Sequence, residues 1–419
     1  MSAHRPTPPP VFAVTIIPFA AAVGYVTIAA PYWLAVRGAS VAAIGTMSGL
    51  AMAPHAFKAL WAPVLDVGAR RRAWYLGMSV LTAALIAVLA LLPAPEAHLG
   101  VFTALAFVVN FAGTTACAAA DGLMAITSAP DRRGAAAAWR MAGNVGGTGV
   151  LGAGILWIAA RTSVPIAGVA LAIVVLLAGT AAIPIDEPRE LVAGRAGSAA
   201  REAVHKLGVI LRDVWQMVKS RDGWTALVIC AVPVGAGALT NLFSALAPSY
   251  GASEDRVAFV NGLWGGIVGA AGSFAGGWIA DRMNRRLAYA LSGALIAACA
   301  LAMLAGPMNE ATYTWGTLAY NFATGVSFAA LAAFILELVG HGAAATKYTL
   351  FIAVANLASS YVTALDGWAS EVRGLGARGT IAADAILTVA GIAVLLALAW
   401  WTRGAAAAGR ADPAGVPRL

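Results

Sequence analysis

Charge is scarce in this sequence. Only 11% of its 419 residues are charged and 60% are hydrophobic, with a mean hydropathy of +0.80. Soluble domains have about 25% charged residues. A soluble protein this apolar would need an interior far larger than its surface, so the composition argues against a soluble fold and favours a protein that lies in the bilayer.

Several catalytic motifs are also absent. The sequence has no G-x-x-x-x-G-K-[ST] phosphate loop, no H-E-x-x-H and no paired Asp-rich diphosphate motif, which argues against ATP-driven pumping and intramembrane catalysis. Of the five histidines only His55 lies in an apolar run. Cys117, Cys230 and Cys299 have neither metal-ligand nor disulfide spacing and are interpreted as core residues. We therefore expect no enzyme activity, no cofactor and no bound metal.

Long apolar runs fill most of the chain. A membrane-spanning helix needs about 20 apolar residues, and windows of that length predict twelve such helices. The predicted spans are 11–34, 41–62, 73–93, 99–125, 134–159, 164–184, 224–248, 257–280, 287–306, 312–337, 347–366 and 380–402. An even number of spans puts both termini on one side of the membrane.

The distribution of basic residues predicts which side that is. With the N-terminus inside, 20 of the 27 Lys and Arg residues fall in inside loops and five in outside loops. Because cytoplasmic loops collect Lys and Arg, we expect both termini to be cytoplasmic in the inner (plasma) membrane. This bias also accounts for the net charge of +8 without nucleic acid as a partner. The first apolar run is expected to be a retained helix rather than a cleaved signal peptide.

The spans divide into two groups around one long polar stretch. We predict a six-helix bundle over 1–184, a cytoplasmic linker over 185–223, a second bundle over 224–403 and a disordered tail over 404–419. Within the linker, the stretch from Ala199 to Ser220 has apolar residues on one face and is predicted to form an amphipathic helix on the inner surface.

A short charged pattern occurs once in each half. Asp66 is followed at +4 and +5 by Arg70 and Arg71, and Asp281 is followed in the same way by Arg285 and Arg286. The Ala-rich segments 134–140 and 342–348 repeat at a similar offset. Such traces indicate two homologous halves, a common plan among transporters.

The second copy of the pattern, 277–286 (GWIADRMNRR), resembles the conserved cytoplasmic turn of the major facilitator superfamily. The resemblance implies a gating role for both turns, in which an Asp at a helix end pairs with Arg or with a neighbouring helix and breaks away in the other conformation. The alternative is an ordinary inside loop with a solvated Asp. The residues concerned are Asp66, Arg70, Arg71, Asp281, Arg282, Arg285 and Arg286.

Three further segments resemble the AmpG-like permeases. They are 54–66 (PHAFKALWAPVLD), which 70–74 (RRRAW) follows, then 119–123 (AADGL) and 345–350 (ATKYTL). At Cys117 and Lys347 the chain differs from that family's pattern. The resemblance implies proton-linked movement of a fairly large polar solute, usually inward, with muropeptides, siderophores and acyl-CoA compounds as substrate classes.

Charged residues inside the apolar runs are the strongest functional candidates, since each costs about 2.5–3.5 kcal/mol on insertion scales. Asp121 is predicted to exchange a proton, with Lys58 and Arg140 attracting an anionic group. The alternative is a structural salt bridge between helices. Glu337 is a second proton-coupling candidate, with interfacial solvation as the alternative. Loop or cap roles are expected for Asp366 and Asp384 near the outer surface.

Amides and aromatic rings within the spans are candidates for substrate binding. For each of them, hydrogen bonding between helices or aromatic packing is the alternative. These candidates are Asn110, Asn144, Asn321, Asn356, Tyr25 and Trp264.

Together these patterns predict an all-α membrane protein of twelve transmembrane helices in two pseudo-symmetric six-helix halves. We expect a monomeric secondary transporter that imports a polar, anionic solute by proton-coupled alternating access. An exporter of the same fold and a non-transporting membrane sensor are the alternatives. The sequence leaves substrate identity, direction and stoichiometry open.

Overall fold

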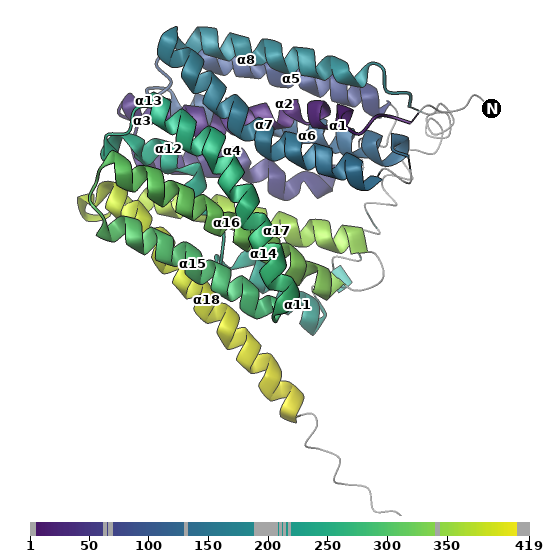
Figure 1. Ribbon diagram of the computed structural model, residues 1–419, viewed down its shortest axis with the longest axis vertical. Helices are drawn as coiled ribbons and strands as arrows, with labels where there is room; N and C mark the ends of the chain where they lie inside the picture. Colours follow the sequence, from purple (N-terminus) through teal and green to yellow (C-terminus); the bar gives the residue numbers. More distant parts are fainter. Residues whose placement is uncertain are drawn as a thin grey trace, which may run out of the picture.

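All regular secondary structure is helical in the part of the chain that the computed structural model describes. The described residues are 6–61, 65, 70–129, 133–187, 208, 212, 215–216, 219–339 and 344–408. The helices run side by side as one long bundle (Figure 1). The helices of the first half, up to residue 187, pack together on one side, and those of the second half, from residue 219, pack on the other.

The first half follows the predicted spans closely. Its first span is α1, α2, η1 and α3 in direct succession. The bounds are α1 (Val11–Thr15), α2 (Ile17–Gly24), η1 (Tyr25–Ala29), α3 (Ala30–Val36), α4 (Val41–Trp61), α5 (Arg71–Leu91), α6 (Leu99–Thr127), α7 (Arg133–Arg161), α8 (Val164–Gly179) and η4 (Thr180–Ala182).

The second half is less regular. Its bounds are α11 (Arg221–Ala231), η5 (Ala238–Asn241), α12 (Phe243–Leu246), η6 (Ala247–Tyr250), α13 (Glu254–Val257), η7 (Ala258–Trp264), α14 (Gly265–Arg282), α15 (Arg285–Ala305), α16 (Glu310–Val339), α17 (Ala344–Ala369), η8 (Val372–Gly374) and α18 (Gly376–Ala408). The amphipathic helix predicted over 199–220 and the tail predicted over 404–419 fall largely outside the described residues. Residues 404–408 belong to α18.

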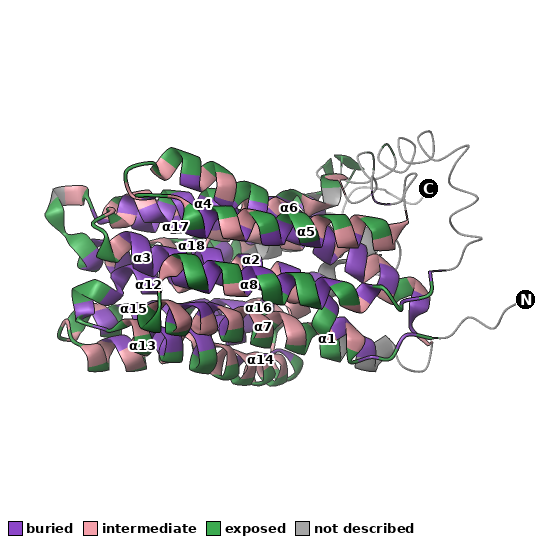
Figure 2. Ribbon diagram, turned by 90° about the horizontal axis from the view of Figure 1, so that it is seen from above, coloured by how far each residue is buried: buried purple, intermediate pink, exposed green. Residues whose placement is uncertain are grey.

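Ten helices in the described part are long and apolar enough to cross a membrane. They correspond to ten of the twelve predicted spans, and the remaining two are α4 and the span predicted over 224–248. The α4 helix is long enough, with 21 residues, but it carries His55 and Lys58. Large apolar side chains such as Phe274 and Trp315 cover the outside of the bundle, as expected for a lipid-facing surface. Buried residues lie inside it (Figure 2).

The prediction of one continuous helix over 224–248 is wrong. The helix α11 ends at Ala231, and the chain resumes helical structure only at Ala238. The intervening sequence holds Pro233, which has no N–H to donate, and Gly237, whose φ of +62° is left-handed. This span is therefore a discontinuous helix.

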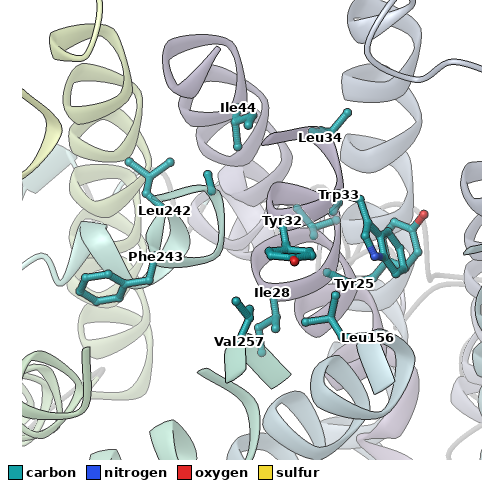
Figure 3. Packing of buried hydrophobic residues seen from close by; sticks show 14 of the residues in the cluster. Tyr25, Ile28, Tyr32, Trp33, Leu34, Ile44, Leu156, Leu242, Phe243 and Val257 are labelled. Carbon is teal, nitrogen blue, oxygen red and sulfur yellow. The ribbon is translucent and has the colours of Figure 1, made fainter. Parts of the chain in front are cut away.

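The two halves share a hydrophobic core at one end of the bundle. Tyr32 and Trp33 of α3 lie in the same buried cluster as Leu242 and Phe243 of the second half and Val257 of α13 (Figure 3). We call this the closed end. The cluster holds the halves together there without requiring any charged contact.

Glycines let the halves approach closely at the closed end. A Cβ at Gly45 of α4 would lie 2.8 Å from the Cα of Gly367 on α17, and one at Gly149 of α7 would lie 2.3 Å from the carbonyl oxygen of Gly262 in η7. Both distances are shorter than any real Cβ contact, so only glycine permits this packing. Small residues are the usual means of close helix packing in membranes.

Candidate functional site

A cavity of about 320 Å³ lies between the halves. Helices from both halves contribute to it, and its polar lining is made of amides and hydroxyls. The polar lining residues are Thr27, Asn144, Thr148, Thr240, Asn241, Asn261, Ser273, Asn321 and Thr324. Uncharged groups of this kind can donate and accept hydrogen bonds to a polar solute without the cost of burying a charge.

Irregular backbone surrounds this cavity. Thr27 lies in η1 and Asn261 lies in η7, which are π-helical segments inside longer helices. Thr240 and Asn241 belong to η5, which follows the break in the discontinuous helix. π-helical segments are frequent at functional sites, and substrate sites of transporters are often formed where helices are interrupted.

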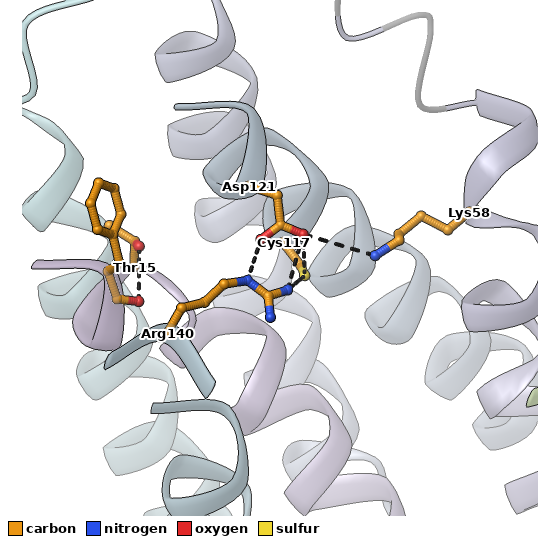
Figure 4. A network of polar contacts seen from close by, with 6 residues as sticks. Thr15, Lys58, Cys117, Asp121 and Arg140 are labelled. Carbon is orange, nitrogen blue, oxygen red and sulfur yellow. Dashed lines mark hydrogen bonds and ion pairs between the residues drawn. The ribbon is translucent and has the colours of Figure 1, made fainter. Parts of the chain in front are cut away.

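A charged cluster lies within the first half. Arg140 of α7 forms an ion pair with Asp121 of α6, and its second guanidinium nitrogen donates to the other carboxylate oxygen at 3.0 Å. Lys58 of α4 approaches that oxygen to 4.0 Å from the opposite side (Figure 4). The Sγ of Cys117, one helical turn before Asp121, accepts from Arg140 at 3.2 Å.

This cluster has an excess of positive charge and is half-buried. One carboxylate faces two cations, and the side chains of Lys58 and Asp121 are 31% and 32% exposed. The structure thus brings together the three charged residues predicted from the sequence. None of the three lines the cavity, but Arg140 is one turn from Asn144 and two turns from Thr148 on the same face of α7, and both of these do.

The other predicted binding residues lie in different surroundings. Asn321 lines the cavity with Asn144. Asn110 is fully buried on α6, where its amide oxygen lies 3.3 Å from Nε2 of His55. Tyr25 is buried in the core with its ring edge-on to Trp33.

Neither of the two remaining candidates lines the cavity. Trp264 is 40% exposed and packs against the exposed ring of Phe259. Asn356 is half-buried on α17. Glu337 belongs to α16, and its side chain lies outside the described part of the chain.

The turn in the first half is anchored to its neighbours. Asp66 lies outside the described residues. Arg70 immediately precedes α5, and the side chain of Arg71 donates to the carbonyl oxygen of Gly122, next to Asp121, at 3.2 Å. The buried Glu187 accepts from the backbone N–H of Arg71 at 3.1 Å and so caps α5 at the positive end of its dipole.

The turn in the second half is more open. Asp281 and Arg282 are exposed, and the Arg282 guanidinium lies over the Trp278 ring of its own helix at 4.1 Å. Asn284 caps α15 by accepting from the N–H groups of Arg286 and Leu287. Arg286 faces Phe334 at 5.9 Å, and Arg285 is half-buried. In this conformation no ion pair of Asp281 is present among the described residues.

Three polar side-chain contacts between described residues join the halves, and all three lie at the closed end. The indole N–H of Trp33 donates to Glu254 at 2.8 Å, Arg161 pairs with Asp255 at 2.9 Å, and the Ser40 hydroxyl donates to Glu371 at 2.9 Å. These contacts reinforce the shared core, so this end of the bundle is sealed in the present conformation.

Comparison with known proteins assigns the fold. The sequence profile of the Major Facilitator Superfamily matches residues 12–363. The chain belongs to this superfamily. The anhydromuropeptide permease of Escherichia coli strain K12 is 25% identical over 367 residues, which cover 82% of this chain and 70% of the permease.

Solved structures agree with that assignment. The nucleoside transporter NupG has a TM-score of 0.71 at 15% identity and covers 93% of this chain and 98% of its own. An inward-facing, occupied bacterial homologue of the human lysosomal transporter Spinster has a TM-score of 0.68 at 12% identity and covers 93% and 95%. At such identities these likenesses show the fold. The protein is thus a multi-pass membrane transporter of the major facilitator fold, as the sequence predicted.

In this major facilitator protein the prediction for Asp366 and Asp384 is wrong. We expected loop or cap roles near the outer surface, but both side chains are buried, at 0% and 1% exposure. Asp384 of α18 accepts from the hydroxyl of Tyr320 on α16, at 2.9 and 3.0 Å for its two oxygens. The helices that carry these acids, α17 and α18, extend beyond the predicted spans, and this places both acids inside the bundle.

Proposed function

We propose that this transporter moves a polar, anionic solute across the inner membrane by proton-coupled alternating access, in the inward direction. The observation that carries the proposal is the half-buried cluster of Asp121, Arg140 and Lys58. Two cations around one carboxylate leave a net positive site at a place where charge is costly. A substrate carboxylate or phosphate would satisfy that excess.

The same cluster offers a way to couple protons to the solute. When Asp121 takes up a proton, its ion pair with Arg140 weakens and the guanidinium becomes free for the anion. When the anion leaves, Asp121 can release its proton and re-form the pair. Proton and anion would then bind together, which is the thermodynamic requirement for symport.

The cavity is placed to receive the uncharged part of the solute. Asn144 and Thr148 continue the face of α7 on which Arg140 lies, and Asn321 approaches from the second half. A solute whose acidic group reached Arg140 could thus present hydroxyl or amide groups to both halves at once. Muropeptides, siderophores and acyl-CoA compounds all combine these features, and the E. coli relative is named an anhydromuropeptide permease.

The inward direction is proposed from the resemblance to the AmpG-like permeases, and the orientation of the chain indicates which side the present conformation would serve. The bias of 20 basic residues to five favours both termini in the cytoplasm. The closed end, which holds α3, α12 and α13, then faces outward, and the charged cluster lies toward the cytoplasm. The present conformation would be the one that releases solute inward, and the exposed Asp281 turn would pair only when the cytoplasmic end closes.

Uptake into proteoliposomes tests the proposal. Purified full-length protein would be supplied with labelled anhydromuropeptide, siderophore and acyl-CoA solutes under an imposed proton gradient. We expect uptake of one class that an uncoupler abolishes and that Asp121→Asn loses. Glu310→Gln is the matched control, since Glu310 pairs with Arg256 on the surface of the second half and should keep uptake. Uncoupler-insensitive uptake, or unchanged uptake by Asp121→Asn, would refute the proton-coupling role.

A further inference from the structure

Two acidic side chains are buried next to each other in the second half, and the described residues place no cation beside them. Asp366 of α17 and Asp384 of α18 lie within hydrogen-bonding reach, at 0% and 1% exposure. In the described part of the chain, the titratable groups that act on either carboxyl are the other carboxyl and the Tyr320 hydroxyl. The other elements packed on α17 at this level are α4, which presents Gly45 and Gly49, and η5, whose residues Ala238–Asn241 carry no titratable side chain.

The hydrogen bonding of the pair requires a proton. The Tyr320 hydroxyl donates a hydrogen bond to Asp384, but neither oxygen of Asp366 has a donor among the described residues. The Asp384 carboxyl is within reach of Asp366, and one of the two can donate to the other only if it is protonated. Two ionised carboxylates in contact, buried and without a cation, would combine charge repulsion with the desolvation of both groups.

The position of the pair connects the cavity to the closed end. The Tyr320 ring packs edge-on against Phe243 at 5.2 Å, and Phe243 lines the cavity. On the other side, Asp366 immediately precedes Gly367, which packs against Gly45 of the first half. Any opening of the closed end must separate Gly367 from Gly45 and so bring water toward Asp366.

From this geometry we propose that Tyr320, Asp384 and Asp366 form a proton-binding site that holds one proton between the two carboxyls while the closed end is shut. Opening of that end would hydrate the pair and let the proton leave, since water can stabilise two separate carboxylates. The site is independent of the Asp121 cluster. It rests on the proposed function only in requiring that the closed end opens.

Infrared spectroscopy of the full-length protein at neutral pH tests the site directly. The wild type is expected to show a protonated-carboxyl band that Asp366→Asn/Asp384→Asn loses. Asp121→Asn is the matched control and should keep the band, because Asp121 pairs with Arg140 in the first half and takes no part in this site. Tyr320→Phe, which removes one hydrogen bond, should shift the band without removing it.

Two results would overturn the proposal. One is an unchanged protonated-carboxyl band in the Asp366→Asn/Asp384→Asn variant, when that variant elutes from gel filtration as the wild type does. The other is loss of the wild-type band when sodium replaces choline in the buffer, which would make the pair a monovalent-cation site. Sodium is the relevant competitor because the buried Thr380 hydroxyl, which has no hydrogen-bond partner in the described part of the chain, lies one turn from Asp384. Neither readout requires transport, so a failure to find a solute would leave this test unaffected.

Labelling from outside tests the link to the closed end. Thr27→Cys places a thiol in the cavity, and an impermeant maleimide reaches it from outside only when the closed end opens. Because maleimide reacts with the thiolate, each labelling rate is divided by that of the same thiol in unfolded protein at the same pH. We expect this ratio to rise several-fold with increasing pH in the wild-type background and to be independent of pH in the double-amide background. The same pH profile in both backgrounds would refute the coupling.

Discussion

The two halves of this transporter each bury acidic groups, and they neutralise them in opposite ways. In the first half, Asp121 has two cations within 4.0 Å and is 32% exposed. In the second half, Asp366 and Asp384 are fully buried, and the donor that the described residues offer them is a tyrosine hydroxyl. An acid that faces cations can stay ionised and exchange partners with a substrate, whereas a pair without cations must hold a proton.

Breaking the ion pair of the first half should have the largest effect. In Arg140→Leu the carboxylate of Asp121 keeps only Lys58, and the substrate anion loses its guanidinium. A hydrogen bond to a charged group is worth about 1.5–3 kcal/mol, so KM should rise roughly tenfold to a hundredfold. Arg140→Lys should lower KM part of the way back to the wild-type value, because it restores the charge without the bidentate geometry of the guanidinium.

Uptake kinetics in proteoliposomes measure both variants. Protein that folds but transports with the wild-type KM in Arg140→Leu would show that the cluster is a structural salt bridge.

Forcing the closed end apart should test whether close glycine packing seals it. A side chain at Gly367 would lie 2.8 Å from the Cα of Gly45. Overpacking of this kind costs about 1–3 kcal/mol, and here that cost falls only on the sealed conformation. Gly367→Val should therefore increase labelling of Thr27→Cys from outside. Gly100→Val is the control, since a Cβ at this exposed helical position meets no neighbour, and it should leave labelling unchanged.

Removing the tyrosine hydroxyl should have a smaller effect. Tyr320→Phe leaves Asp384 without its donor, at a cost of about 0.5–1.5 kcal/mol for a hydrogen bond. We expect a lower melting temperature of the purified protein. In the Asp384→Leu background Tyr320→Phe should cost less, because no acceptor for the hydroxyl is left at position 384. Equal costs in the two backgrounds would show that the Tyr320–Asp384 bond does not stabilise the fold.

An exposed ion pair should matter least. Arg161 and Asp255 bridge the halves, but their side chains are 45% and 58% exposed. Surface pairs contribute about 0–1 kcal/mol, so Arg161→Gln should change labelling of Thr27→Cys by at most about fivefold. A change as large as that of Gly367→Val would mean that charge, and not the glycine packing, seals this end.

The sequence predicted the first-half cluster because a charge in an apolar run is conspicuous. Lys58, Asp121 and Arg140 stand among apolar residues on three predicted spans, and the structure brings them together. The turns around Asp66 and Asp281 were also found from a repeated pattern, but their gating role remains a prediction. The break in the span over 224–248 could have been found from Pro233 and Gly237, which the surrounding apolar residues concealed.

The second-half pair could not be recognised because it depended on helix boundaries. The predicted span ending at 366 put Asp366 at a helix end, and the span beginning at 380 put Asp384 one turn inside. Polar side chains cost little free energy at these positions, because water can reach them. The observed helices reach Ala369 and begin at Gly376, so both acids lie inside the bundle. That they face each other and Tyr320 is a consequence of tertiary packing, which no local pattern in the chain records.

The most direct test of the account is whether a solute gradient alone moves protons. Proteoliposomes that contain a pH-sensitive dye would be given the best solute from the uptake panel with no imposed pH gradient. We expect the interior to acidify with wild-type protein and Glu310→Gln, and not with Asp121→Asn. Solute entry with no change in internal pH would contradict proton-coupled transport through this chain.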